Sequence, residues 1–120
     1  VEEVLTVLER RRYLDDREFA VLRARSRRTL KRWGNRRIAL DLRRLGVDAR
    51  MVEFALRQVD EELPEVESLK RVIEIWTAGS GVPERVQDLK RLYDHCLRLG
   101  YPERLVRSEL SGYFLDVEWN

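Results

Sequence analysis

The sequence predicts an all-α protein of about seven helices, arranged as tandem three-helix repeats. Only 6 glycines and 3 prolines occur among the 120 residues, and leucine, arginine and glutamate dominate. This composition favours helices joined by short connections. Apolar residues recur at helical spacing, and no stretch alternates between apolar and polar residues with a period of two. We therefore expect helices throughout and no strands.

The expected helix boundaries follow from this spacing and from the turn residues between the periodic segments. The helices are expected at residues 1–12, 15–32, 35–45, 48–60, 66–78, 83–99 and 102–111. The stretch "DEELPEVE" at residues 60–67 is acidic and contains Pro64. Because proline interrupts helices, this stretch is expected to form a bend or linker.

Two adjacent carboxylates, Asp15 and Asp16, follow the basic run "RRRYL". They could form a catalytic or metal-binding pair, or they could mark the start of a helix. With Asp15 as N-cap, Glu18 occupies the capping-box position, and Leu14 and Phe19 form a hydrophobic staple. Every residue then has a local structural role, and no histidine stands nearby in sequence. The capping interpretation is favoured.

The same start signal recurs in "LGVDARMVEFAL" at residues 45–56. Gly46 is expected to end one helix and Asp48 to cap the next, with Val47 and Val52 as the staple.

The halves of the chain show a weak self-similarity with a period of about 67 residues. The matched apolar positions are Val4, Leu5 and Leu8 with Val72, Ile73 and Trp76, and Phe19, Leu22, Ser26 and Leu30 with Val86, Leu89, Tyr93 and Leu97. We expect two domains: a basic three-helix repeat with a connecting helix at residues 1–60, and an acidic three-helix repeat at residues 61–120. The chain begins at Val1 within an amphipathic pattern, so an N-terminal part is expected to be missing.

Positive charge is concentrated in the first half of the chain. Residues 1–60 contain 16 lysines and arginines against 10 acidic residues, whereas residues 61–120 contain 8 against 12. This asymmetry suggests that the first half binds a polyanion or an acidic protein surface.

The helix expected at residues 15–32 has an apolar side and a basic side. At about 100° per residue, Phe19, Leu22, Ser26, Leu30 and Trp33 share the side expected to face the core. The other side carries Arg17, Arg25, Arg27, Arg28, Lys31 and Arg32, and no acidic residue occurs between Glu18 and Asp41. A solvated face normally mixes charges to form i,i+4 pairs.

The next helix, in "WGNRRIALDLRRLG", also carries cations, and the stability of the helix does not explain their positions. Arg36 and Arg37 lie in its first turn, where the helix dipole disfavours each exposed cation by roughly 0.3–1 kcal/mol. Arg43 and Arg44 lie at its favourable end. A solvated basic surface is one interpretation; a binding surface for nucleic acid or acidic protein is preferred.

Other candidate residues are weaker. His95 and Cys96 are neighbours on a helix and do not share a face, so a Cys–His catalytic pair is not expected. Trp33 and Trp76 are interpreted as core anchors rather than base-stacking platforms, and Trp119, near the end of the chain, is left unassigned.

The single cysteine excludes an internal disulfide and a cysteine zinc cluster. No apolar run approaches the ~18 residues of a membrane span, and no signal-peptide pattern occurs. The cytoplasm is the expected compartment.

The tract "YLDDREFA", a basic helix and "RWGNRRIALDLRRLGVDARMVEFAL" resembles the second repeat of the RecX family, whose members regulate the RecA recombinase. The resemblance covers about residues 1–60. Arg12 stands where the family usually has glycine, and Asn35 where it often has proline; both are turn positions. "KRLYDHCLRLGYPERLVRSEL" at residues 90–110 is similar to the third repeat, less specifically. The first repeat would then be the missing N-terminal part.

The resemblance implies a non-enzymatic regulator that lodges in the groove of the RecA–DNA filament and reduces recombinase, ATPase and coprotease activity. We further expect no cofactor and no metal, a monomer, no membrane contact, and weak binding of free single- or double-stranded DNA. The residues expected to bind the RecA–DNA filament are Arg25, Arg28, Lys31, Arg32, Arg36, Arg37, Arg43 and Arg44.

Two other functions remain open from the residues alone. The first is a free-standing nucleic-acid-binding domain, with helix 35–45 in a groove like a helix-turn-helix reader. That helix carries few of the side chains that read base edges, which argues against sequence-specific binding. The second is an enzyme, but no set of nucleophile, base and orienting group can be assembled.

Overall fold

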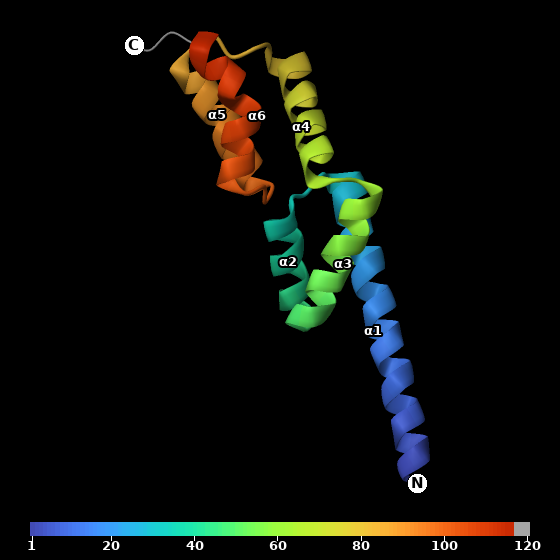
Figure 1. Cartoon of the computed structure of the whole chain (residues 1–120). Coiled ribbons are helices and arrows are strands. Elements are labelled where there is room, and N and C mark those ends of the chain that lie inside the picture. Colours follow the sequence, from blue (N-terminus) through green and yellow to red (C-terminus); the bar gives the residue numbers. More distant parts are fainter. Residues whose placement is uncertain (117–120) are drawn as a thin grey trace.

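The structure is a computed structural model that describes residues 1–116, and Trp119 lies outside the described residues. Over that range it consists of helices without strands (Figure 1), which confirms the all-α prediction. The six helices are α1 (Glu2–Lys31), α2 (Asn35–Arg44), α3 (Ala49–Glu62), α4 (Glu65–Ser80), α5 (Val86–Arg98) and α6 (Glu103–Asp116). None of these described helices is long and apolar enough to cross a membrane.

The helices expected at residues 1–12 and 15–32 are one continuous helix, α1. The prediction that Asp15 caps a helix is therefore wrong, because Asp15 lies in the middle of α1 and is exposed. Neither glycine nor proline occurs before Gly34, so nothing interrupts the helical hydrogen bonds at this point. The expected helix cap at Asp48 and the expected break at Pro64 are confirmed. Asp48 accepts a hydrogen bond from the Met51 N–H at 2.9 Å, and Pro64 separates α3 from α4.

The described part of the chain contains two hydrophobic cores, each built by three consecutive helices. The core of α1–α3 includes Ala20, Ala24, Ile38, Leu42, Val47, Met51, Val52, Ala55 and Val59. The core of α4–α6 includes Leu69, Val72, Ile73, Leu89, Leu92, Cys96, Tyr101, Val106 and Leu110. We propose that each set of three helices is one repeat, with the boundary at Pro64.

Burial identifies Cys96, Trp33 and Trp76 as parts of these cores. Cys96 is fully buried, and burial raises the pKa of its thiol to about 12, which leaves it an inert core residue. Trp76 packs against the second core and contacts the His95 ring, and Trp33 packs against the first.

The face of α1 that meets the core is not the expected one. Ala20, Ala24 and Arg28 are fully buried, whereas Phe19 is 46% exposed and Leu22 is 52% exposed. Alanines allow a partner helix to approach closely, and α3 packs along α1 here. Helical spacing alone could not choose between the two faces, because α1 has apolar residues on both.

The molecule is elongated, with extents of 72 × 20 × 18 Å. The first half of α1 projects beyond α2 and α3 (Figure 1). Its apolar side chains Val4, Leu5, Val7 and Leu8 are all more than half exposed.

The structure also corrects the register of the internal repeat. "LGVDARMVEFAL" at residues 45–56 corresponds to "LGYPERLVRSEL" at residues 99–110, an offset of 54 residues. At this offset four buried residues of the first half match buried residues of the second: Ile38 with Leu92, Leu42 with Cys96, Val47 with Tyr101, and Val52 with Val106. The expected period of about 67 residues is wrong, because it equates residues 1–12, which lie outside both cores, with α4.

Candidate interaction surface and the junction that holds it

Arg28, expected on the exposed basic side of α1, is buried at the junction between the two cores. Its side chain is 0% exposed. Nε donates to the Trp33 carbonyl at 2.8 Å, Nη1 donates to Asp60 Oδ1 at 3.0 Å and to the Leu63 carbonyl at 2.7 Å, and Nη2 donates to Asn35 Oδ1. The expectation that Arg28 lies on the exposed side of α1 is therefore wrong. Its guanidinium joins the ends of α1, α2 and α3 instead.

Asn35 extends this junction to α4. Its backbone N–H donates to Glu65 Oε2 at 2.7 Å, and its Nδ2 donates to Asp60 Oδ2 at 3.0 Å. Burial raises the pKa of Glu65, and the Asn35 N–H and the charge of Arg28 partly oppose this shift. The hydrogen bond from the Asn35 N–H compensates part of the cost of burying this partly exposed carboxylate.

The start of α2 meets the turn between α5 and α6 through backbone contacts. The Gly34 N–H donates to the Leu99 carbonyl at 2.7 Å, and the Arg36 N–H donates to the Gly100 carbonyl at 3.0 Å. A Cβ added at Gly34 would lie 2.5 Å from the Gly100 carbonyl carbon. Glycine is therefore required at residue 34, because the backbone segments at Gly34 and Gly100 approach too closely to leave room for a side chain.

Tyr101 closes the junction from the second core. Its hydroxyl donates to the Arg32 carbonyl at 2.7 Å and lies 2.7 Å from Ser68 Oγ, which therefore acts as the donor in that second bond. Burial raises the pKa of Tyr101 to about 12. Arg32 itself adopts a left-handed conformation (φ 55°, ψ 39°) at the C-cap of α1 and is only partly exposed.

This junction also explains the cations in the first turn of α2. The C-terminal carbonyls of α5 face the N-terminus of α2, so opposite ends of two helix dipoles meet there. Arg37 Nη1 donates to the Arg98 carbonyl at 3.2 Å. The negative end of α5 thus offsets part of the unfavourable interaction between Arg37 and its own helix.

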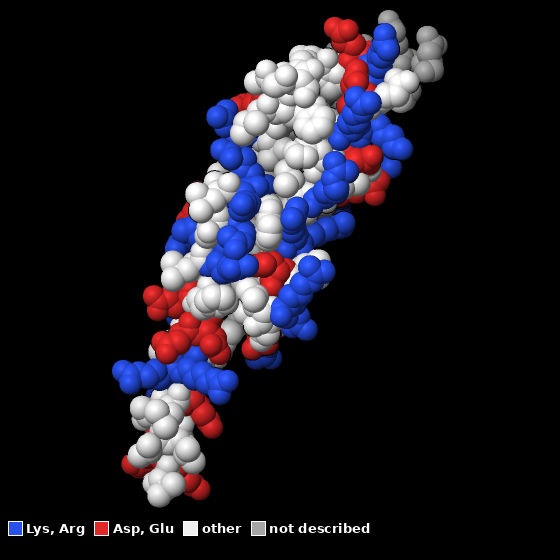
Figure 2. Space-filling view, turned by 180° about the vertical axis from the view of Figure 1, so that it is seen from behind, with Lys and Arg blue, Asp and Glu red and all other residues white. Residues whose placement is uncertain are grey.

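Five of the eight expected binding residues are exposed: Lys31, Arg36, Arg37, Arg43 and Arg44, which we call the basic face. Among residues 1–116 no carboxylate forms an ion pair with any of them. Arg25, by contrast, is paired with Glu62 through two hydrogen bonds of 2.6 Å. Figure 2 shows lysine and arginine side chains gathered over the middle of the molecule and continuing in rows on both sides of an uncharged area.

The cations of α2 form two rows along the helix. Arg36 and Arg43 are seven residues apart and share one side, as do Arg37 and Arg44. Leu40, which is 50% exposed, lies between the rows and opposite the buried Ile38 and Leu42.

The Trp33 ring positions the side chains of Arg37 and Arg27. The guanidinium of Arg37 lies 4.2 Å from the centre of the Trp33 ring, and that of Arg27 lies 5.6 Å from it. Such cation–π contacts are worth about 0.5–1 kcal/mol at exposed sites. They hold two arginines in place, and neither guanidinium forms an ion pair with a carboxylate in the described part of the chain.

Sequence reasoning missed the residues of the junction, namely Asn35, Asp60, Glu65, Ser68, Gly100 and Tyr101. One signal could have found part of it. The 54-residue repeat aligns the helix-ending Gly46 and Gly100, and it sets Asn35 and Asp60 against the apolar Leu89 and Phe114. Polar residues in one repeat, at two positions that are apolar in the other, indicate that they form specific hydrogen bonds there instead of packing in the core.

The fold and this surface define a class: a helical-repeat protein with a basic face that forms no ion pair within residues 1–116 and a buried polar junction beside it. Residues 15–56 match the family described as RecX, second three-helix domain. The chain belongs to the RecX family. No solved structure matches it.

Two curated relatives are similar over nearly the whole chain. "Regulatory protein RecX" of Amycolatopsis mediterranei is 30% identical over 116 residues, which is 93% of this chain and 66% of the relative. "Regulatory protein RecX" of Streptomyces coelicolor is 32% identical over 121 residues, which is 98% of this chain and 64% of the relative. The chain therefore spans slightly less than two thirds of the length of these relatives.

Proposed function

We propose that the protein is a non-enzymatic regulator that binds the RecA–DNA filament and inhibits its recombinase, ATPase and coprotease activities. The proposal takes the regulatory role from the relatives, which are named regulatory proteins. It takes the partner from the resemblance of residues 1–60 to the second RecX repeat. On this proposal the protein acts in the cytoplasm, as a monomer.

The observation that carries the proposal is the basic face. Five exposed cations that form no ion pair within residues 1–116 are poised to pair with phosphates or carboxylates of another molecule. A DNA filament coated with protein offers both kinds of anion. The junction through Arg28, Asn35 and Gly34 fixes α2 against the second core. Binding therefore has a smaller entropic cost, because the helix that carries most of these cations is already held in place.

A free-standing helix-turn-helix reader is a weaker candidate. Such readers place the N-terminal residues of the recognition helix against base edges in the major groove. Here the N-terminus of α2 is occupied by the turn between α5 and α6, through Gly34 and Arg36. Its remaining exposed positions are arginines and Leu40, which do not provide the Asn or Gln side chains that read adenine.

The test is to compare the affinity for RecA-coated single-stranded DNA with the affinity for the same DNA without RecA, at one near-physiological salt concentration. We expect tighter binding to the coated DNA, since protein surfaces add contacts that bare DNA lacks. Binding to bare single strands should weaken with salt at a logarithmic slope of about −0.7 per neutralised phosphate. Equal affinities for the two would favour the nucleic-acid-binding alternative over a filament regulator.

A further inference from the structure

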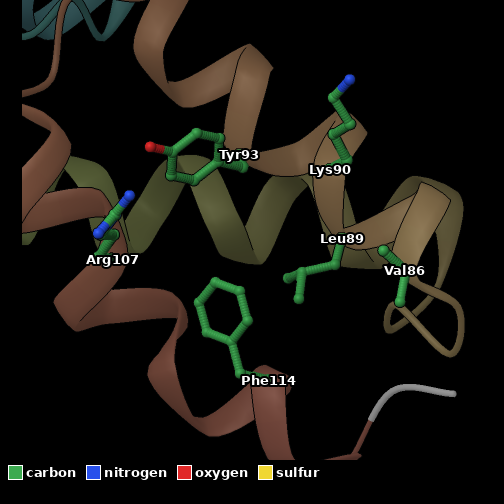
Figure 3. Close-up of a pocket in the computed structure, with 6 residues that line it drawn as sticks. All are labelled: Val86, Leu89, Lys90, Tyr93, Arg107 and Phe114. Carbon is green, nitrogen blue, oxygen red and sulfur yellow. The ribbon is translucent and has the colours of Figure 1, made fainter. Parts of the chain in front are cut away.

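A pocket of about 580 Å³ lies between α5 and α6 (Figure 3). It is lined by Val86, Leu89, Lys90, Tyr93, Arg107 and Phe114. Figure 3 shows the rings of Tyr93 and Phe114 on either side of an open space, with Leu89 directed into it. The pocket is thus an apolar space with an aromatic ring from each helix.

This pocket is not a general consequence of the repeat. At the 54-residue offset, Leu89 and Phe114 correspond to Asn35 and Asp60 in the first half. There the two side chains are joined by a hydrogen bond of 3.0 Å within the junction. The second half has apolar residues at both positions, and these residues face an open pocket.

Positive side chains occur at the rim of this pocket as well as on the basic face. Lys90, which lines the pocket, is the repeat counterpart of Arg36 on α2, and both are exposed. Arg107, also in the lining, is paired with Glu103 at 2.7 Å and is 68% exposed. The Arg36 N–H donates to the Gly100 carbonyl at 3.0 Å, which places Arg36 at the turn between α5 and α6. A hydrogen bond from Tyr93 and the charge of Arg107 lower the pKa of Glu103, and the charge of Arg36 contributes less.

We propose that this pocket accepts one unstacked base of a single-stranded nucleic acid, while Lys90, Arg107 and Arg36 contact the neighbouring phosphates. Single-strand binding sites combine a cationic track with aromatic rings on which bases stack. The faces of a base need no hydrogen-bond partner, and the helical backbones of α5 and α6 have none to offer. An extended peptide would lack main-chain partners here. The inference does not depend on RecA and so goes beyond the proposed function.

The first measurement uses the unchanged protein and two fluorescently labelled probes of equal length, an oligothymidylate and an oligonucleotide of abasic sites. Both present the same phosphates, so only the first can fill the pocket. Because stacking of one base on an aromatic side chain is worth about 1–3 kcal/mol, we expect about 5-fold tighter binding of oligothymidylate or more. Equal affinity for the two probes would overturn the proposal.

The second measurement locates the effect. Val86→Asp places a carboxylate in the pocket at the first position of α5, where an acidic residue suits the helix dipole and folding is expected to persist. Phe114→Ala removes one ring. Each should abolish the preference for oligothymidylate, and circular dichroism should show unchanged helix content. A preference that persists in both folded variants would place the base elsewhere and contradict the proposal.

The third measurement separates the phosphate contacts from overall charge. Lys90→Gln should weaken oligothymidylate binding several-fold more than Arg91→Gln, which removes the same charge from the adjacent residue of α5 outside the pocket. Equal losses would contradict a local contact. Suppose that the unchanged protein bound both probes equally and that Val86→Asp lowered RecA inhibition. The pocket would then bind a protein side chain, and the proposal of a bound base would be wrong. If the protein did not affect RecA at all, only the function proposed above would fail.

Discussion

Arg28 Nη1 lies 3.0 Å from Asp60 Oδ1, and this ion pair forms although the Arg28 side chain is completely buried and Asp60 is 36% exposed. Removal of one partner of a buried pair typically costs about 3–5 kcal/mol. Because Asp60 can still be hydrated, we expect Arg28→Ala to lower the free energy of unfolding by about 3 kcal/mol, measured by urea denaturation. Arg28→Lys should not restore it, since one ammonium cannot reproduce four directed hydrogen bonds. Wild-type stability of Arg28→Ala would show that the pair is dispensable.

Gly34→Ala should separate the two cores. The added Cβ would lie 2.5 Å from the Gly100 backbone, which cannot move aside like a flexible side chain. We expect a loss of more than about 1 kcal/mol of unfolding free energy, as overpacking costs typically 1–3 kcal/mol. The control is Gly79→Ala, in α4, where a Cβ meets nothing within 4 Å. It should stabilise the helix by about 0.5–1 kcal/mol. Similar effects of the two changes would refute the close approach.

Arg32 allows charge and backbone strain to be separated. Its left-handed conformation (φ 55°) disfavours residues other than glycine by roughly 1–2 kcal/mol. Arg32→Gly should therefore unfold at a higher temperature than Arg32→Ala, although both remove the same charge. If the charge contributes to filament binding, both variants should bind equally weakly. A loss of binding in Arg32→Ala alone would assign the role of Arg32 to the backbone.

Protonation of Asp41 at acid pH should lower the stability of the protein. A bidentate interaction with Arg23 lowers the pKa of Asp41 in the folded state, through a hydrogen bond of 2.8 Å and one of 3.1 Å. A lowered folded-state pKa contributes stability above the unfolded-state pKa of about 3.9, and this contribution is lost as pH falls through the folded-state value. Asp41→Asn should therefore show a smaller decrease in stability between neutral pH and about pH 3, measured by denaturant titration. An identical pH dependence in the variant would exclude this ion pair as a source.

Local signals predicted the fold where one local interaction decides the structure. Pro64 interrupts a helix wherever it stands, and the cap at Asp48 follows Gly46, which ends the preceding helix. The signal at Asp15 is chemically similar. It failed because no turn residue precedes it, and helical hydrogen bonds continued through it.

The candidate surface was predictable only in part, for a related reason. Arg36, Arg43 and Arg44 are exposed as expected, because α2 is short and has one clear apolar side. Arg28 lies opposite the largest apolar residues of α1, so spacing assigned it to solvent. Its partners Asp60 and Leu63 stand more than thirty positions later, and no local pattern in α1 indicates them.

The most direct test of the account is RecA ATP hydrolysis on single-stranded DNA in the presence of two matched triple variants. Arg36→Gln/Arg43→Gln/Arg44→Gln removes three charges of the basic face, and Arg50→Gln/Arg57→Gln/Lys70→Gln removes three exposed charges elsewhere. Both change the net charge equally, and both should keep wild-type melting behaviour. We predict that the first loses most of the inhibition shown by the unchanged protein and that the second retains it. Equal inhibition by the two variants would contradict the claim that the basic face carries the regulation.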